Sequence, residues 1–138
     1  MESDTLSQLS EDKIKELAEN ITRTATPYGT CLLSGMRKNR DAYVYSCITE
    51  DSRGIRGKLV ANHRIIYFHK NKDSFCDRKN VLSHRCHIKS CININHLSLE
   101  PQAINIERKD CFRNKSKSKR DRNTCKGHEA PYDPCIFI

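Results

Sequence analysis

The sequence lacks any long apolar segment. Hydrophobic residues make up 36% of its 138 positions, and no run approaches the roughly eighteen apolar residues that a membrane span requires. A membrane is therefore not an expected partner. The length fits one domain, residues 1–138, but so low a hydrophobic content supports only a modest core. We expect this fold to need stabilisation from something other than apolar packing.

A secretory leader is also missing from the first residues, MESDTLSQLSEDK. They are acidic and polar, whereas such a leader is basic and then apolar. We therefore expect an intracellular protein, in which thiols stay reduced and the eight cysteines do not form a disulfide framework. Metal binding explains their number better, and zinc is the first candidate. A secreted cationic disulfide protein is the alternative that this reasoning disfavours.

Acidic charge is concentrated at the start of the chain, and the rest is strongly basic. Residues 1–20 hold six acids and two lysines, so the remainder carries +12 of a net charge of +8. A basic body favours a polyanionic partner, most simply nucleic acid, although basic faces also occur on proteins that bind none.

The first predicted element is a helix over residues 10–21. Ser10 is its N-cap, acids occupy its first turn, and Ile14, Leu17 and Ile21 share one face. We interpret residues 1–27 as a helical extension that serves packing or dimerisation. Thr26 to Gly29 is predicted to be a turn.

Residues 42–48 and 55–61 are rich in β-formers and are separated by a turn, so we expect an antiparallel sheet. Basic residues accompany it, and such a ribbon fits a DNA major groove. An ordinary solvated basic face is an equally open interpretation. The candidate DNA-binding residues are Arg37, Lys38, Arg40, Arg56 and Lys58.

Four further segments complete the expected organisation. Residues 62–69 are predicted to form a short helix capped by Asn62, and residues 70–80 a polar loop. Residues 100–108 predict a helix with Pro101 in its first turn. Residues 108–126 carry nine basic residues and are predicted to form a flexible loop.

Potential metal ligands are most closely spaced in the middle of the chain. Cys86, Cys91 and His96 offer two thiolates and an imidazole within eleven residues, which one tetrahedral zinc can accept if a distant fourth ligand joins. Cys31 is the favoured fourth ligand. A second set consists of Cys111, Cys125, His128 and Cys135. Two structural zinc ions are the preferred interpretation, with free buried cysteines and redox pairs as the alternatives.

Two polar residues near the first set are not needed for zinc. His84 follows the apolar pair Val81-Leu82, where its ring would be held firmly, and a fixed neutral imidazole suits a general base that deprotonates water. Asn105 lies on the predicted helix after the zinc loop. Its amide oxygen suits a hard cation such as magnesium.

The order of these residues resembles the His-Cys box of the homing endonucleases, in the ββα-metal (His-Me finger) nuclease superfamily. In that family a catalytic His precedes the first zinc site, a metal-binding Asn follows on a helix, and a second zinc cluster comes last. The upstream CLLSG and LVANHRIIYF segments extend the resemblance over residues 31–135. The matching residues are His84, Cys86, Cys91, His96, Asn105, Cys111, Cys125, His128 and Cys135.

The resemblance implies a small α+β, zinc-stabilised ββα-metal fold with antiparallel sheets, short helices and long loops. It also implies a site-specific double-stranded DNA endonuclease with one magnesium ion. His84 would activate water, Asn105 would hold the magnesium, and an arginine on the preceding sheet would support the phosphate, with Arg53 favoured over Arg56. The family's usual setting and its pairing on pseudo-palindromic sites predict a nuclear homodimer.

A second hypothesis is that the chain retains the fold but has no catalytic activity. The same zinc-stabilised fold would then serve as a catalytically silent DNA-binding module derived from such a nuclease. His84 and Asn105 favour the enzyme, because neither residue is required as a zinc ligand.

Overall fold

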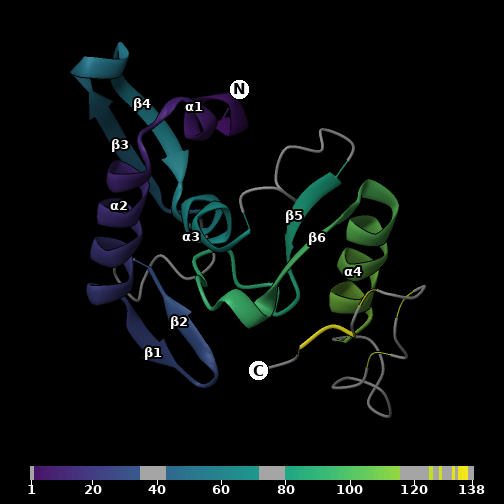
Figure 1. Cartoon of the computed structure of the whole chain (residues 1–138). Coiled ribbons are helices and arrows are strands. Elements are labelled where there is room, and N and C mark those ends of the chain that lie inside the picture. The colour runs from purple at the N-terminus through teal and green to yellow at the C-terminus, as the bar shows by residue number, and fades with distance from the viewer. Residues whose placement is uncertain are drawn as a thin grey trace.

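The computed structural model describes residues 2–34, 43–71, 80–115, 125, 128, 132 and 134–136. Along these residues two α-helices are followed by two antiparallel two-stranded sheets, then a helix, another such sheet and a final helix (Figure 1). The predicted α+β class is confirmed. The part of the chain that the structure describes contains no helix long and apolar enough to cross a membrane.

The N-terminal region forms two helices, α1 (Glu2–Gln8) and α2 (Glu11–Arg23). Ser10 caps α2 as predicted, because its hydroxyl accepts a hydrogen bond from the Lys13 N–H at 3.2 Å. The buried face of α2 contains Ile14, Ala18 and Ile21. Helix α1 was not predicted, and it buries Leu6 completely.

Strands β1 (Thr26–Tyr28) and β2 (Cys31–Leu33) form a short hairpin where only a turn was predicted. The turn is at Gly29 and Thr30, so Gly29 is the one predicted turn residue that lies in it, and its φ of 59° suits a residue without a Cβ. Strand β2 also lies against residues 90–92: Leu33 bridges Cys91, and the Ile92 N–H donates to the Leu32 carbonyl at 2.7 Å.

The predicted sheet is present as β3 (Tyr45–Glu50) and β4 (Ile55–Ala61), joined through the 3₁₀ turn η2 (Asp51–Arg53). Ile48 and Val60 are fully buried. Arg56 and Lys58 are exposed. The predicted DNA-binding residues Arg37, Lys38 and Arg40 lie outside the described residues.

Helix α3 (Asn62–Lys70) follows β4 directly and buries Ile65, Ile66 and Phe68 in the main core. The prediction that Asn62 caps this helix is wrong, because the N-cap position is Ala61 and no side chain caps the helix there. The Asn62 side chain instead accepts a hydrogen bond from Ser46 and donates one to Ser34. Of the predicted polar loop over 70–80, Lys70 is helical, Asn80 begins the next strand, and 72–79 are not described.

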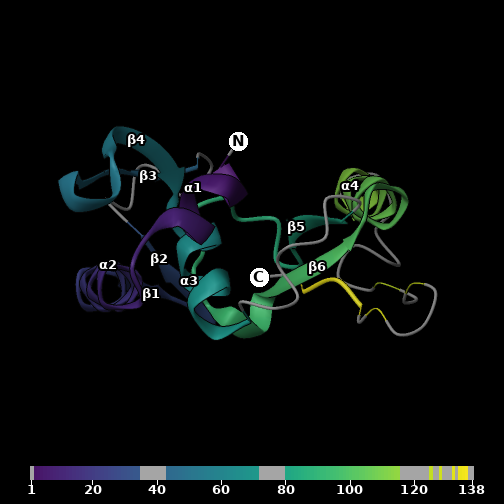
Figure 2. The ribbon, with the colours of Figure 1, turned by 45° about the horizontal axis from the view of Figure 1, so that its top comes forward.

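A ββα unit completes the fold. Strands β5 (Asn80–His84) and β6 (Leu97–Pro101) pair antiparallel, with the 3₁₀ turn η4 (Ile94–His96) before β6, and α4 (Gln102–Lys115) packs on both strands. Figures 1 and 2 place this unit on the opposite side of α3 from the turn between β3 and β4.

Helix α4 corrects two predictions. Pro101 ends β6, so the helix starts at Gln102, and it continues through residues 108–115, where a flexible loop was expected. The basic composition misled the prediction because Arg108 is a buried side chain rather than a solvated one. Of the rest of the predicted loop, 116–124 and 126 lie outside the described residues, and Cys125 is described.

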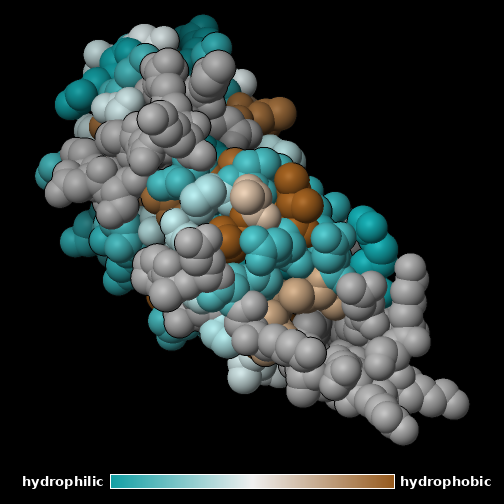
Figure 3. All heavy atoms as spheres, turned by 90° about the vertical axis from the view of Figure 1, so that its right-hand side faces the viewer, coloured by the Kyte–Doolittle hydropathy of each residue, from teal (hydrophilic) through white to brown (hydrophobic). Residues whose placement is uncertain are grey.

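The main apolar core lies among α1, α2, α3 and the β3–β4 hairpin. A separate small cluster contains Cys31, Leu33, Cys86 and Cys91. On the face drawn in Figure 3, which carries the ββα unit, hydrophilic side chains predominate over scattered apolar patches among the described residues. Most buried residues of the main core therefore come from outside the ββα unit, which contributes the partly buried Leu82.

Candidate metal centres and nuclease site

The first cluster unites four side chains from three segments. Cys31 comes from β2, Cys86 and Cys91 from the loop after β5, and His96 from η4. All four are buried, and their ligand atoms lie within 4.8 Å of one another. His96 Nδ1 is 3.4 Å from the Cys31 sulfur and 3.6 Å from that of Cys91. The pairing of β2 with residues 90–92 explains how the distant Cys31 reaches this loop.

Hydrogen bonding among the three thiols shifts their pKa values in opposite directions. Contacts with Cys86 and Cys91 raise the pKa of Cys31, whereas contacts with Cys31 and Cys86 lower the pKa of Cys91 to about 2. Adjacent thiols cannot all ionise without a cation, because each thiolate repels the next. Such a packed set is well suited to a divalent ion that neutralises the thiolates.

The second cluster lies where α4 meets the C-terminal segment. Cys111 comes from α4, and the Cys125 sulfur lies 3.8 Å from that of Cys111. His128 Nε2 is 3.4 Å from both the Cys125 and the Cys135 sulfur atoms. Backbone bonding holds this segment in place, since the Ile136 N–H donates to the Arg85 carbonyl at 2.7 Å.

Both clusters fit zinc. Tetrahedral ligands at about 2.3 Å for sulfur and about 2.0 Å for nitrogen lie about 3.5 to 3.8 Å apart. The ligand separations observed, 3.4, 3.6 and 3.8 Å, match those edges. Each set offers three thiolates and one imidazole, which is a closed ligand set for a structural zinc ion.

His84 ends β5 next to the first cluster. Its Nε2 lies 2.9 Å from the Cys91 carbonyl oxygen. A carbonyl only accepts hydrogen bonds, so Nε2 carries the proton and Nδ1 keeps its lone pair. Burial lowers the pKa of His84 to about 4, which keeps the imidazole neutral near pH 7. A fixed, neutral imidazole of this kind can accept a proton.

Aromatic rings surround His84. The His63 ring from α3 lies 4.5 Å from it between centroids, and Tyr43 lies 5.3 Å from His63 in a stacked arrangement. Burial, and then the nearby His84, lower the pKa of His63 well below its ordinary value. The Lys89 ammonium lies 5.4 Å from the centroid of the half-exposed Tyr43 ring. Tyr43 and Lys89 are the exposed members of this group, whereas His63 and His84 are buried.

Asn105 extends from α4 toward β5. Ser83, the residue before His84, donates its hydroxyl hydrogen to Asn105 Oδ1 at 2.9 Å. An amide oxygen has two lone pairs, so one remains for a cation. Magnesium takes few protein ligands and completes its shell with water and substrate oxygens, and Asn105 therefore fits as one magnesium ligand.

A family model described as the zinc-binding loop region of homing endonuclease matches residues 22–137. This match covers both Cys/His clusters, the ββα unit and the His84–Asn105 region. The chain belongs to this homing endonuclease family. Comparisons with curated proteins and with solved structures each gave no match.

Membership in the homing endonuclease family confirms the resemblance drawn from the His-Cys box, and it implies DNA binding. The structure brings together the four residues predicted for each zinc site. It also brings Asn105 to the end of β5, because Asn105 accepts a hydrogen bond from Ser83, the residue before His84.

Two predicted arginines of this family member lie on the β3–β4 hairpin. Arg53 ends the exposed turn η2, which Figures 1 and 2 place across α3 from β5. The guanidinium of Arg56 pairs with Asp51 at 3.2 Å on the surface. The turn that carries Arg53 and the strand that ends in His84 therefore belong to different parts of the described fold.

Several site residues were not predicted from sequence. Tyr43 and Ser83 have no spacing signal, because contacts between segments distant in the sequence bring them to the site. Arg108 was assigned to a flexible tract although it is only 1% exposed. The His63-Arg64 segment was noted in the family resemblance, but nothing in it predicted a ring contact with His84.

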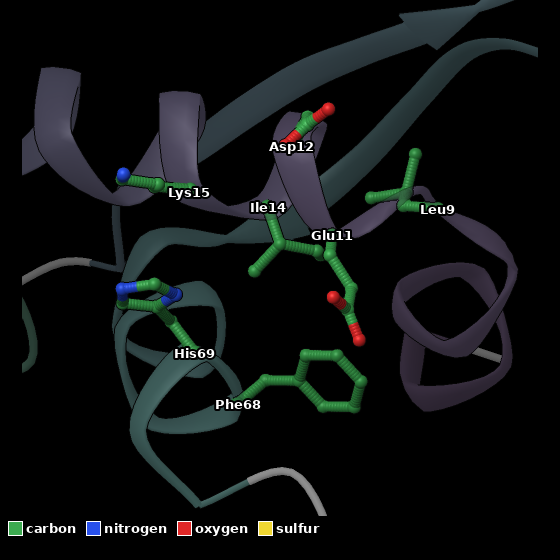
Figure 4. A pocket seen from close by; sticks show the side chains of 7 residues that line it. All are labelled: Leu9, Glu11, Asp12, Ile14, Lys15, Phe68 and His69. Carbon is green, nitrogen blue, oxygen red and sulfur yellow. The ribbon is translucent and has the colours of Figure 1, made fainter.

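A separate pocket of about 320 Å³ lies between the start of α2 and the end of α3 (Figure 4). Its lining includes Lys15, Phe68 and His69. None of the predicted site residues contributes to it.

Two cysteines belong to neither metal cluster. Cys47 is exposed on β3, and Cys76 lies outside the described residues.

Proposed function

We propose that this chain is a magnesium-dependent, site-specific double-stranded DNA endonuclease, with two structural zinc ions holding its fold. The observation that supports this best is the hydrogen bond of His84 Nε2 to the Cys91 carbonyl, at 2.9 Å. It presents Nδ1 as the free acceptor. The first zinc cluster thereby fixes both the position and the tautomer of the proposed general base.

His84 Nδ1 would accept a proton from a water molecule whose oxygen attacks the scissile phosphorus. The 3′ oxygen then leaves as the phosphorus–oxygen bond breaks. Asn105 would hold one magnesium ion, which supplies positive charge to the scissile phosphate and the leaving oxygen. Ser83 fixes the orientation of the Asn105 amide.

We propose that an arginine of the β3–β4 hairpin supports the phosphate once DNA is bound, with Arg53 favoured and Arg56 as its alternative, although the unbound structure has the η2 turn across α3 from β5. Comparing the cleavage rates of Arg53→Ala and Arg56→Ala decides between them. Arg56 and Lys58 are exposed on β4, and we propose that they also contact DNA. Arg37, Lys38 and Arg40 belong to the same proposed surface.

Two copies of the chain on a pseudo-palindromic site would cut both strands, and we propose a homodimer on DNA. Sedimentation of the protein with its recovered target site tests this stoichiometry. A nuclear location is the accompanying prediction, tested by imaging a tagged full-length chain.

The deciding experiment is cleavage of a randomised duplex library by the zinc-loaded protein, with and without added magnesium. Magnesium should be omitted rather than chelated, because a chelator would also strip zinc. His84→Ala and Asn105→Ala are the test variants, and His69→Ala, an exposed position on α3, is the control.

Recurring, magnesium-dependent cuts that only the test variants lose would support the endonuclease. Zinc content and thermal melting of the test variants should match the parent protein. Salt-sensitive DNA binding by a well-folded parent that never cleaves would instead identify a catalytically silent DNA-binding module.

A further inference from the structure

Arg108 of α4 is buried between a carboxylate and a zinc-ligand cysteine. Its side chain is 1% exposed, and that of its partner Glu100 on β6 is fully buried. Arg108 Nε lies 2.9 and 2.8 Å from the two Glu100 oxygens, and Nη1 donates to the Cys135 sulfur at 3.6 Å. The guanidinium thus links the ββα unit to the second cluster.

Burial of this charge needs an explanation beyond stability. Removing two charges from water is costly, and an apolar pair of the same size is often at least as stable. The remaining nitrogen, Nη2, is buried without a hydrogen-bond partner among the described residues. Simple packing of α4 on β6 does not require such an arrangement.

The charge of the second cluster supplies that explanation. Three thiolates around one divalent zinc carry a net charge of about −1. A guanidinium that donates to one of these sulfurs neutralises this charge, and charge-assisted hydrogen bonds are about twice as strong as neutral ones. Glu100 then holds the guanidinium at the correct position.

The neighbouring Glu107 acts on the other side of the same cluster. Its carboxylate Oε1 lies 3.2 Å from His128 Nδ1, while His128 Nε2 faces the sulfurs. A carboxylate accepts, so Nδ1 carries the proton and Nε2 keeps the lone pair that zinc needs. Two consecutive residues of α4 therefore contact two different zinc ligands.

We propose that Glu107 and Arg108 set the affinity of the second zinc centre, with Glu100 as the anchor of Arg108. Through this outer layer the helix that carries Asn105 is coupled to zinc loading at the C-terminal segment. The proposal requires that the second cluster binds zinc, and it does not depend on DNA cleavage.

The test measures how fast zinc leaves the full-length protein for a colorimetric chelator. The two zinc ions are distinguished by their separate release rates. The Glu107→Ala variant is the first arm, because the Glu107 side chain is 53% exposed and its removal leaves the core unchanged. Lys109→Ala, also exposed on α4, is the matched control. Loss of an outer-layer partner typically weakens metal affinity about 10-fold to 100-fold.

The second arm removes both buried charges together, as Glu100→Met with Arg108→Met, so that neither is left unpaired. Arg108→Lys keeps the charge and should recover part of the parent's slow release. Alkylation of the released thiols, mapped by mass spectrometry, identifies which cluster has opened.

We expect faster release of one zinc ion only, with alkylation at Cys111, Cys125 and Cys135 and parental protection of the first cluster. Release of both ions at parental rates in Glu107→Ala and in the double variant would overturn the proposal. Equal acceleration of both ions would also overturn it, because that result indicates general destabilisation.

Discussion

Ser83 on β5 donates a hydrogen bond to the amide oxygen of Asn105 on α4, with 2.9 Å between the two oxygens. The strand that ends in the proposed base therefore also orients the proposed magnesium ligand. This contact therefore links the strand that carries His84 to the helix that carries Asn105.

Ser83→Ala should weaken magnesium-dependent cleavage without disturbing the fold. An unrestrained Asn105 amide samples orientations that do not face the cation, so the magnesium concentration for half-maximal cleavage should rise about 10-fold to 100-fold. A magnesium titration of the cleavage rate measures this. Ser98→Ala is the matched control, because Ser98 pairs with Ser83 on the neighbouring strand. An unchanged magnesium dependence would remove Ser83 from this role.

His63→Ala should slow cleavage by removing the ring that packs on His84. A contact between aromatic rings is worth about 0.5–1.5 kcal/mol beyond its buried area, and small displacements of a catalytic group can cost up to about 100-fold in rate. We expect kcat to fall about tenfold or more with KM little changed. The control is His69→Ala, on the exposed side of the same helix. Parental kcat in His63→Ala would show that His84 is positioned without this ring.

Cys91→Ala should remove one zinc ion and abolish cooperative folding. Structural zinc contributes on the order of 10 kcal/mol in zinc-finger peptides, which is comparable to the whole stability of a typical domain. Metal analysis and thermal unfolding measure both effects. Cys47→Ala should keep both ions, because Cys47 is exposed and outside both clusters. A cooperative parental transition in Cys91→Ala would show that Cys91 is not a required ligand.

The sequence was sufficient for the metal clusters because thiol and imidazole side chains are uncommon and their spacing is informative. It was sufficient for α2 and the β3–β4 hairpin because capping, periodicity and β-formers agree there. Cys31 was only the favoured fourth ligand of the first cluster, because its place there depends on the pairing of β2 with residues 90–92, which its distance along the chain does not reveal.

Two of the errors share one physical cause, which is tertiary contact overriding local pattern. Asn62 has a typical capping side chain, but Ser46 and Ser34 use its hydrogen-bonding groups. Arg108 stands in a basic tract, but Glu100 and Cys135 bury it. None of these four partners is an immediate neighbour in the sequence, so the local pattern does not reveal the contacts.

Loss of the Ser10 hydroxyl should destabilise the protein in a pH-dependent way. Ser10 donates its hydroxyl hydrogen to Glu50 Oε2 and its N–H to Glu50 Oε1, and these bonds lower the pKa of Glu50. The folded pKa lies below the unfolded one. This contribution is therefore fully present above roughly pH 4.3 and is lost as the pH falls through the folded pKa.

Ser10→Ala should cost about 1 kcal/mol at pH 7 through the lost cap alone, and the difference from the parent should narrow in acid. Urea unfolding at pH 7, 5 and 3.5 measures this trend. In Glu50→Gln the group no longer titrates, so the acid loss of stability should be shallower than in the parent. Identical acid profiles for the parent and Glu50→Gln would contradict the assignment.

Lys58→Ala should weaken DNA binding at all sequences and make it less sensitive to salt. Each phosphate contact releases counterions and contributes about 0.9 to the slope of log affinity against log salt on duplex DNA. Removing an exposed lysine of β4 that contacts one phosphate should therefore reduce the slope by about that amount. Binding isotherms on two unrelated duplexes at several salt concentrations measure the slope. Lys15→Ala, on α2 beside the separate pocket, should leave it unchanged. If Lys15→Ala lowers the slope and Lys58→Ala does not, the DNA surface lies on α2 rather than on the β3–β4 hairpin.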